Sequence, residues 1–159
     1  MALSLLDDIE PETPSEARRE LRWAAALHET GMMISHHDYH RHSAYVLSHV
    51  DAPGFSQSQL RRIGDLVLGQ RGGLRKLEAR LSEMSFALHL FCLRLAVIVC
   101  HDRGDVDPAG LALHGMAGHP TLAPTLGWAE THPRALHLLR EEIEAWSRSG
   151  VLQPALAPS

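Results

Sequence analysis

A chain of 159 residues, 45% of them hydrophobic, has enough apolar material for one globular domain with a small appendage. Its formal net charge of −4 is mild, so no overall basic excess marks a nucleic-acid-binding protein, and the composition is not that of a disordered chain. Cys92 and Cys100 lie in one apolar segment, at a spacing that a helix would not let a disulfide bridge. We therefore expect buried free thiols, as in a reducing cytoplasm.

Two stretches bear on targeting. The first twelve residues, MALSLLDDIEPE, are acidic and have no basic segment before an apolar run, so we expect no signal peptide and interpret residues 1–12 as a loose lead-in. The longest apolar run, Phe86–Cys100, is interrupted by His89 and Arg94 and is too short to span a bilayer. We expect a cytoplasmic protein without membrane contact, in which this run forms a central, mostly buried helix.

The segment TPSE predicts the start of a first helix. Thr13 as N-cap, Pro14 at the first helical position and Glu16 at the third form a capping box with proline in its favoured place. This helix is expected to run to about Thr30 and to end at Gly31 in the left-handed conformation. Its predicted apolar face consists of Ala17, Leu21, Ala24 and His28.

Two further helices follow from their own caps. Asp38 is a suitable N-cap for a helix over 39–49, which the turn DAPGF ends because Pro-Gly cannot continue a helix. Ser56 and Gln59 form a second capping box, and the helix that they start is expected to end near Gln70.

The rest of the chain changes character after a long helix, which is expected over 82–102. Residues 74–81 are compatible with either helix or loop. A Gly/Pro-rich region with a strand at 111–115 follows, then a helix over 133–148 and a short final strand in the last nine residues. Trp128 and Trp146 are expected to pack in the core. We predict a helical unit over 13–103 and a small α+β appendage over 107–156.

Histidines crowd the region between His28 and His49. His28, at a core-facing position, could join Glu29 and His42 from the next helix in a metal site, or could be a polar core residue that hydrogen-bonds to the backbone. His36, His37 and His40 surround the predicted start of the second helix. Charged imidazoles there would bind an anion at the positive helix end, and a solvated helix start is the alternative.

A basic stretch follows the third helix's start. It could track a polyanion or could be a solvated face, and it has no interleaved aromatic residues that would indicate single-stranded nucleic acid. The sequence contains no phosphate-binding glycine-rich loop, no serine-nucleophile elbow and no H-E-x-x-H zinc motif. The stretch consists of Arg61, Arg62, Arg71, Arg75, Lys76 and Arg80, opposed by Asp65 and Glu78.

Three short motifs mark residues 21–59: A-x-L-H-E-x-G at 25–31, H-R-H-S-A-Y at 40–45 and P-G-F at 53–55. With them, this stretch resembles the C-terminal region of the exopolyphosphatase/guanosine pentaphosphate phosphatase (Ppx/GppA) family, and LRLAVIVCHDR at 93–103 is similar to that region's long helix. The resemblance covers the first hundred residues most closely, and the order strand, helix, strand fits the tail.

The resemblance implies a mainly α fold: an HD-domain-like helical bundle followed by a small α+β domain. In that family the chemistry belongs to an N-terminal pair of actin-like domains with glycine-rich phosphate-binding loops, a catalytic glutamate and Mg²⁺. None of that is in these 159 residues. We expect a C-terminal piece or a naturally short protein, with no catalytic residue or cofactor of its own.

The metal-ligand pattern of HD domains, H…HD…D, is degenerate in this sequence. His28 matches the central histidine, but Glu29 stands where aspartate is usual, and no histidine precedes His28. The terminal aspartate would fall near residues 96–97, which are apolar, whereas His42 matches a further histidine of the pattern. Too few donors remain for a tight catalytic metal, so we expect no bound metal and interpret His28, Glu29 and His42 as relics.

The leading hypothesis is a non-catalytic accessory domain of an exopolyphosphatase-type hydrolase, which binds polyphosphate or guanosine pentaphosphate and forms a homodimer. Neutralising several phosphates with cationic side chains releases counterions, as with nucleic acid. One alternative is a surviving HD-type metal-dependent phosphohydrolase that uses His28, Glu29 and His42. Another is a purely structural dimerisation module with the apolar helix over 82–102 in the subunit interface. The candidate phosphate contacts are His40, Arg41, Arg71, Arg75 and Lys76.

Overall fold

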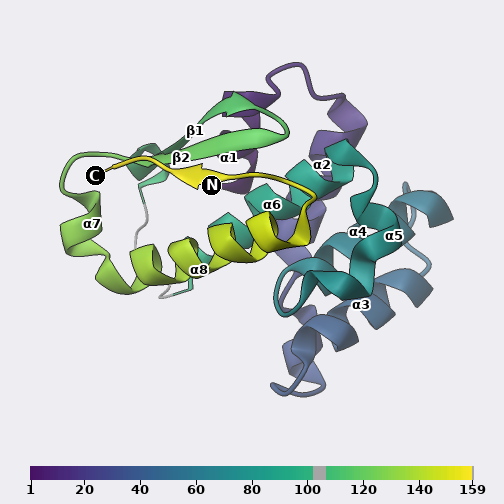
Figure 1. The fold of residues 1–159 in the computed structure, drawn as a ribbon. Coiled ribbons are helices and arrows are strands. Elements are labelled where there is room, and N and C mark those ends of the chain that lie inside the picture. The colour runs from purple at the N-terminus through teal and green to yellow at the C-terminus, as the bar shows by residue number, and fades with distance from the viewer. Residues whose placement is uncertain (102–106, 159) are drawn as a thin grey trace.

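The computed structural model describes residues 1–101 and 107–158, and its fold is mainly helical with one small sheet, as predicted (Figure 1). Among these residues, no helix has both the length and the apolar character that crossing a bilayer requires. The helices are α1 (Ala2–Ile9), α2 (Ser15–Leu27), η1 (Thr30–Met33), α3 (Tyr39–His49), α4 (Gln57–Gly69), η2 (Leu74–Leu77), α5 (Glu78–Leu81), α6 (Met84–Val99), η3 (Pro108–Gly110), α7 (Trp128–Thr131) and α8 (Pro133–Ser149), and the strands are β1 (Leu111–Met116), β2 (His119–Pro124) and β3 (Ala155–Leu156).

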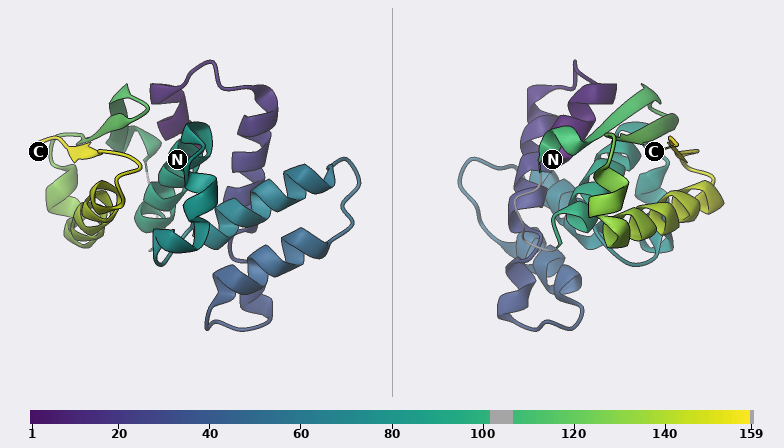
Figure 2. Two further views of the ribbon diagram at one scale, coloured as in Figure 1. Left: turned by 45° about the vertical axis from the view of Figure 1, so that its right-hand side comes forward. Right: turned by 90° about the vertical axis from the view of Figure 1, so that its left-hand side faces the viewer.

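Helix α6 is the centre of the molecule, with the sheet and α8 on one side and the α3–α4 pair on the other (Figures 1 and 2). Nearly all of its residues from Phe86 to Ala96 are fully buried by the chain's own helices, which confirms the prediction of a central buried helix. The residues from Phe86 to Ala96 are thus not available to a subunit interface, and a contribution of the exposed Met84 or of the partly buried end of the helix to a dimer stays a prediction. The predicted end of α6 at residue 102 lies outside the described residues.

The two cysteines have different environments. Cys92, in the middle of α6, is buried, and burial raises the pKa of its thiol far above the usual range. Cys100 is exposed, contrary to the expectation of two buried thiols, because it follows the last residue of α6, where the helix leaves the core.

The first residues form a helix rather than a loose lead-in. Leu5 and Leu6 of α1 are completely buried, and α1 packs against β1 and α6. Asp8 Oδ2 accepts a hydrogen bond of 2.9 Å from the Leu113 amide, and Asp7 pairs with Arg18 of α2. Buried leucines and these polar contacts order a segment that is too short to be stable by helix propensity alone.

The start and stop of α2 differ from the prediction. Thr13 donates its hydroxyl to the Glu10 carbonyl at 2.7 Å instead of capping the helix, and Pro14 is the N-cap without a side-chain bond. The α-helix ends at Leu27, and Gly31 lies in η1 without a positive φ. Gly31 is instead a site of close backbone approach, since its amide donates to Ser43 Oγ of α3 at 2.7 Å.

Helices α3 and α4 lie side by side and have nearly the predicted bounds. The capping box at α4 is confirmed: Gln59 N donates to Ser56 Oγ at 3.2 Å, and Ser56 N donates to Gln59 Oε1 at 2.8 Å. Asp38 occupies the N-cap of α3 but forms no side-chain cap, because its backbone is left-handed with φ 54°. The predicted bounds of α3 were therefore correct, although the side-chain cap from which its start was predicted is absent.

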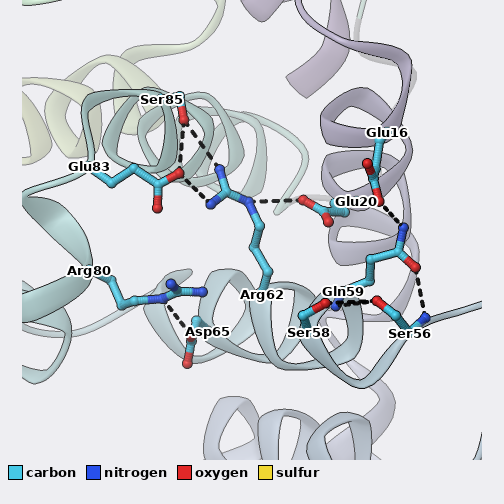
Figure 3. A network of polar contacts seen from close by, with 10 residues as sticks. All are labelled: Glu16, Glu20, Ser56, Ser58, Gln59, Arg62, Asp65, Arg80, Glu83 and Ser85. Carbon is cyan, nitrogen blue, oxygen red and sulfur yellow. Dashed lines mark hydrogen bonds and ion pairs between the residues drawn. The ribbon is translucent and has the colours of Figure 1, made fainter.

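Figure 3 shows the polar network that joins α2, α4 and the start of α6. Arg62 of α4 donates to Glu20 Oε2 at 2.9 Å and to Glu83 Oε1 at 2.7 Å, and its guanidinium lies 5.3 Å from the Phe86 ring. The pairing with Arg62 lowers the pKa of Glu83. Arg80 pairs with Asp65 at 2.9 Å on the same face.

The small sheet has the order β1–β2–β3, with an antiparallel β1–β2 hairpin and a parallel β2–β3 pair. The predicted strands at 111–115 and in the last nine residues are confirmed, whereas β2 and the short helix α7 were not predicted. Buried residues of the helices and of the sheet, including Trp128 and Trp146, belong to one hydrophobic cluster. The division into units at 13–103 and 107–156 stays a prediction.

Candidate functional site

His28 and Glu29 lie together at the end of α2. His28 Nδ1 is 2.8 Å from the Ala25 carbonyl oxygen, to which it donates, and His28 Nε2 is 4.0 Å from Glu29 Oε1. The His28 carbonyl accepts from Ser43 Oγ and from Gln70 Nε2. The polar core interpretation of His28, a histidine bonded to a neighbouring backbone carbonyl, therefore describes it well.

A cavity of about 290 Å³ lies where α1, α2 and α6 meet, and we name it the α2–α6 cavity. His28 and Glu29 line it, and Ala96 and Val97 occupy the wall where the resemblance would place the terminal aspartate of an HD site. His42 is not part of its lining. The residues lining the cavity are Met1, Ala2, Ala25, His28, Glu29, Tyr39, Leu93, Ala96, Val97, Cys100 and His101.

The described residues contain no group of three or more His, Cys, Asp or Glu side chains with the geometry of a metal site. The structure thus brings together His28 and Glu29, but it does not add His42 as a third ligand. An HD-type metal-dependent reaction at these residues gains no support from the geometry.

A second feature is a group of cations that we name the basic cluster: Arg41 at the start of α3, Arg71 shortly after α4, and Lys76 in η2. Lys76 Nζ donates to the Arg71 carbonyl, and the Arg71 guanidinium lies 5.2 Å from the Tyr39 ring. Burial, together with the positive charges of Arg94, Arg41 and Arg71, lowers the pKa of Lys76 to about 8. Asp38 is the acidic residue whose charge acts against this shift.

His40 lies among these cations but does not behave as one. It is only 7% exposed, and burial and the charges of Lys76 and Arg71 lower its pKa to about 4. Its Nδ1 has no hydrogen-bond partner among the described residues. His40 is thus a neutral packing residue at neutral pH, whereas His36 and His37 are exposed and His37 Nε2 lies 3.6 Å from Asp38.

The predicted basic stretch divides between structure and surface. Arg62 and Arg80 are used internally, in the pairs with Glu20, Glu83 and Asp65. Arg61, Arg71, Arg75 and Lys76 are exposed. A surface role is therefore open only to the second group.

Arg71 and Arg75 line two neighbouring hollows, of about 410 and 540 Å³, between the 69–75 segment, α6 and α8. Gly72, Arg94 and Ala145 line both hollows, so the two lie next to each other, and we refer to them together as the groove. Arg148 also lines the groove and was missed by sequence reasoning, because it comes from α8 and forms no basic run. The acidic residues Glu78, Glu141 and Glu142 line it as well, and Glu142 is held by Arg94.

Because His40 and His89 are buried, we expect the free energy of unfolding to decrease at acidic pH. Burial lowers the pKa values of His40 and His89 to about 4, and both ring nitrogens of His89 lack partners among the described residues. The unfolded chain protonates these groups near pH 6.5, so their contribution is complete above that pH and is lost as the pH falls towards 4. We expect roughly 1–3 kcal/mol per histidine. Burial raises the pKa of Glu20, which acts in the opposite direction.

Urea denaturation at half-unit steps from pH 7 to pH 4 measures this dependence. The variant carrying His40→Asn and His89→Leu should show a clearly flatter decline than the parent, whereas His137→Asn, at an exposed position, should not. An equal decline in all three proteins would show that other groups cause the acid sensitivity.

Comparison with known proteins shows which protein family this chain resembles. The family model described as Ppx/GppA phosphatase, domain III, matches residues 1–142. Proteins named guanosine-5'-triphosphate,3'-diphosphate pyrophosphatase match as well: the one from Pseudoalteromonas translucida is 30% identical over 94% of this chain, and the one from Vibrio cholerae serotype O1 is 34% identical over 81%. This chain spans 31% and 26% of their lengths, respectively. The chain therefore belongs to the Ppx/GppA phosphatase family, and it corresponds to domain III of that family.

Proposed function

We propose that this chain is a non-catalytic accessory domain of an exopolyphosphatase- or guanosine pentaphosphate-hydrolysing enzyme, and that it holds a phosphate chain on the basic cluster. The observation that carries the proposal is the crowding of Arg41, Arg71 and Lys76: burial first, and then the charges of Arg94, Arg41 and Arg71, lower the pKa of Lys76 to about 8. Like charges held together in this way lose repulsion when a polyanion lies across them. The names of the relatives, which specify a guanosine phosphate as substrate, support the same ligand chemistry.

The proposed phosphate contacts are the exposed cations. Arg148 is added to the contacts predicted from the sequence, and His40 is removed from them. Arg41, Arg71 and Lys76 would bind one end of the chain, and Arg75 and Arg148 would continue along the groove. His40 would not contact the phosphates, because its ring is buried and is neutral at neutral pH. Catalysis and Mg²⁺ would belong to parts of the enzyme outside these 159 residues.

Titration with long-chain polyphosphate at pH 6.5 and several salt concentrations tests the proposal. We expect salt-dependent binding, and in the variant Arg41→Gln/Arg71→Gln/Lys76→Gln the magnitude of the negative slope of log K against log salt concentration should be smaller by about 2. Arg61→Gln removes an exposed cation of α4 outside the cluster and should change the slope by much less. No salt-dependent binding by the parent chain at low salt would refute the proposal.

The pKa of Lys76 gives a second, independent measurement. The affinity for polyphosphate should fall as the pH rises through about 8, because the ammonium group loses its proton there. Lys76→Arg keeps its charge at pH 9 and should retain binding. A parent protein whose affinity is constant from pH 7 to pH 9 would remove Lys76 from the contacts.

Homodimerisation is the second part of the proposal. Met33 of η1, Ile34 directly after it and Tyr45 of α3 are exposed apolar side chains that a partner could cover. Light scattering after size exclusion measures the mass, and Ile34→Lys should shift a dimer towards monomer. A monomeric parent chain would remove dimerisation from the proposal.

A further inference from the structure

Helix α2 carries a second group of cations on the side that faces away from the core. Arg18, Arg19 and Arg22 line a hollow of about 270 Å³, together with Leu3 and Ser15. Arg22 is four residues from the first of these arginines and three from the second, which is the spacing of neighbours on one helix face. The residues of the basic cluster do not line this hollow, so the two groups of cations are separate features.

Two of the three guanidinium groups are held in place by the chain itself. Arg18 pairs with both carboxylate oxygens of Asp7 in α1, and its Nη2 donates to Oδ2 at 3.0 Å. Arg19 Nη2 donates to the Gly54 carbonyl at 3.0 Å, and its guanidinium lies 4.8 Å from the centre of the Phe55 ring. Because a guanidinium has five N–H donors, both arginines keep donors for a further acceptor. Side chains that are ordered before binding lose less conformational entropy when a partner arrives.

The third arginine is not used by the fold. Arg22 is exposed and, in the part of the chain that the structure describes, forms no hydrogen bond, ion pair or ring contact. No acidic side chain lines the hollow among these residues, and Asp7 offsets the charge of Arg18 alone. The hollow is therefore cationic, and planar guanidinium groups bind carboxylates and phosphates with two parallel hydrogen bonds.

An exposed aromatic side chain adjoins these arginines. Trp23 is 39% exposed, and its ring meets the Phe55 ring edge-on, with the ring centres 5.7 Å apart. Tryptophan and arginine are the residue types that most often dominate the binding energy of protein–protein interfaces. We name Arg18, Arg19, Arg22 and Trp23 the α2 face.

We propose that the α2 face binds an acidic protein segment that has an apolar side chain beside its carboxylates. The carboxylates pair with the three arginines, and the apolar side chain packs on Trp23. An inorganic phosphate chain uses the arginines but leaves the tryptophan exposed. Single-stranded nucleic acid needs several free ring faces for its bases, and Arg19 already lies over the Phe55 ring. The α2 face shares no residue with the basic cluster, so this inference does not depend on the proposed phosphate site.

Selection from a displayed library of random short peptides, with the whole chain as bait, tests the proposal. We expect the enriched peptides to carry Asp or Glu on both sides of an aromatic or aliphatic residue. The most enriched peptide, synthesised and titrated with the chain, should bind more weakly as the salt concentration rises. A selection that yields no peptide whose binding depends on Arg22 would refute the proposal.

Arg22→Glu is the sharpest variant, because this side chain has no partner in the described fold to lose. It should weaken binding of the synthesised peptide by about tenfold or more, since a carboxylate would then face the carboxylates of the peptide. Arg140→Glu makes the same change of charge at an exposed position of α8, a helix without substantial contact to α2, and should have little effect. Equal losses in the two variants would show that net charge, and not the α2 face, determines the affinity.

Tryptophan fluorescence locates the contact independently of any charge change. Trp128 and Trp146 are 6% and 0% exposed, so the neutral quencher acrylamide reaches mainly Trp23. The synthesised peptide should reduce this quenching in the parent chain, whereas Trp23→Phe, which lacks the exposed fluorophore, should show little quenching with or without peptide. A bound peptide that leaves the quenching of the parent unchanged would place its site elsewhere and overturn the proposal.

Competition separates the proposed partner from other anions. Pyrophosphate, a thymidine oligonucleotide and vesicles of phosphatidylglycerol should each displace the peptide only at much higher concentrations than the peptide itself requires. Tighter binding of any of them, with the same loss in Arg22→Glu, would assign the α2 face to that anion and refute the acidic segment. Arg22→Glu should leave the polyphosphate titration unchanged, so a failure of the phosphate site and a failure of the α2 face are distinguishable.

Discussion

Gly31→Ala should destabilise the protein by roughly 3 kcal/mol or more, because a Cβ at this position has no room. It would collide with the Tyr39 carbonyl oxygen, would lie 2.5 Å from the Ser43 nitrogen and would lie 2.8 Å from the His42 Cβ. Two of these neighbours are backbone atoms of α3, so no flexible side chain can move aside. The Gly31 amide would also lose its bond to Ser43 Oγ if the segments separated. Urea denaturation at pH 7.5 measures the change in unfolding free energy.

Gly73→Ala is the matched control. Gly73 has φ −66° and ψ 144°, which any residue adopts, and no heavy atom lies within 4 Å of the position of its Cβ. Alanine there restricts the unfolded chain, so this variant should be neutral or more stable by about 0.4–1 kcal/mol. A Gly31→Ala protein within 1 kcal/mol of the parent would show that α3 and η1 are not in the tight contact described here.

The helices that have clear start and stop signals in the sequence were predicted close to their observed bounds. The capping box at Ser56 and the breakers around each segment placed α3, α4 and α8 close to their observed bounds. Helix α1 was missed although Ala2, Leu5, Leu6 and Ile9 have helical spacing. What orders α1 is contact with β1, more than a hundred residues away, and no local pattern reports that.

Glycine shows the same limit at Gly31. Its position after a predicted helix suggested a left-handed stop, but the structure uses glycine there to let two backbones approach. The choice between these roles depends on the position of α3, which the sequence does not specify locally. Tertiary contact, rather than conformational freedom, explains this residue.

The candidate site was predictable in part. The pairing of His28 with Glu29 follows from adjacency, and the exposed cations Arg71 and Lys76 follow from the basic stretch. The burial of His40 and the contribution of Arg148 to the groove depend on how α8 and α3 pack, so sequence reasoning gave His40 a surface role and missed Arg148. The apolar wall at residues 96–97 looked like a missing ligand, and in the structure it is the side of a cavity.

Arg94→Met should destabilise the protein by about 3–5 kcal/mol, because it leaves Glu142 as a buried, uncompensated charge. Arg94 donates through Nε to Glu142 Oε1 at 2.5 Å and through Nη2 to Glu142 Oε2 at 2.7 Å, and both side chains are 8% exposed. Its Nη1 donates to the carbonyls of Gly69 and Gly72 at 2.6 and 3.0 Å. One guanidinium thus joins α6, α8 and the end of α4, and urea denaturation measures what its loss costs.

The double variant Arg94→Met/Glu142→Met separates the pair from its surroundings. The double variant contains no unpaired buried carboxylate, so it should be more stable than Arg94→Met alone. Replacing both members of a buried ion pair by apolar residues usually costs less stability than removing one member. Recovery should be incomplete, because the Gly69 carbonyl and Trp146 Nε1, which donates to Glu142 at 2.6 Å, lose their partners. Arg80→Met, which breaks the more exposed pair with Asp65, should cost at most about 1 kcal/mol. Equal losses for Arg94→Met and Arg80→Met would contradict the structural role assigned to the buried pair.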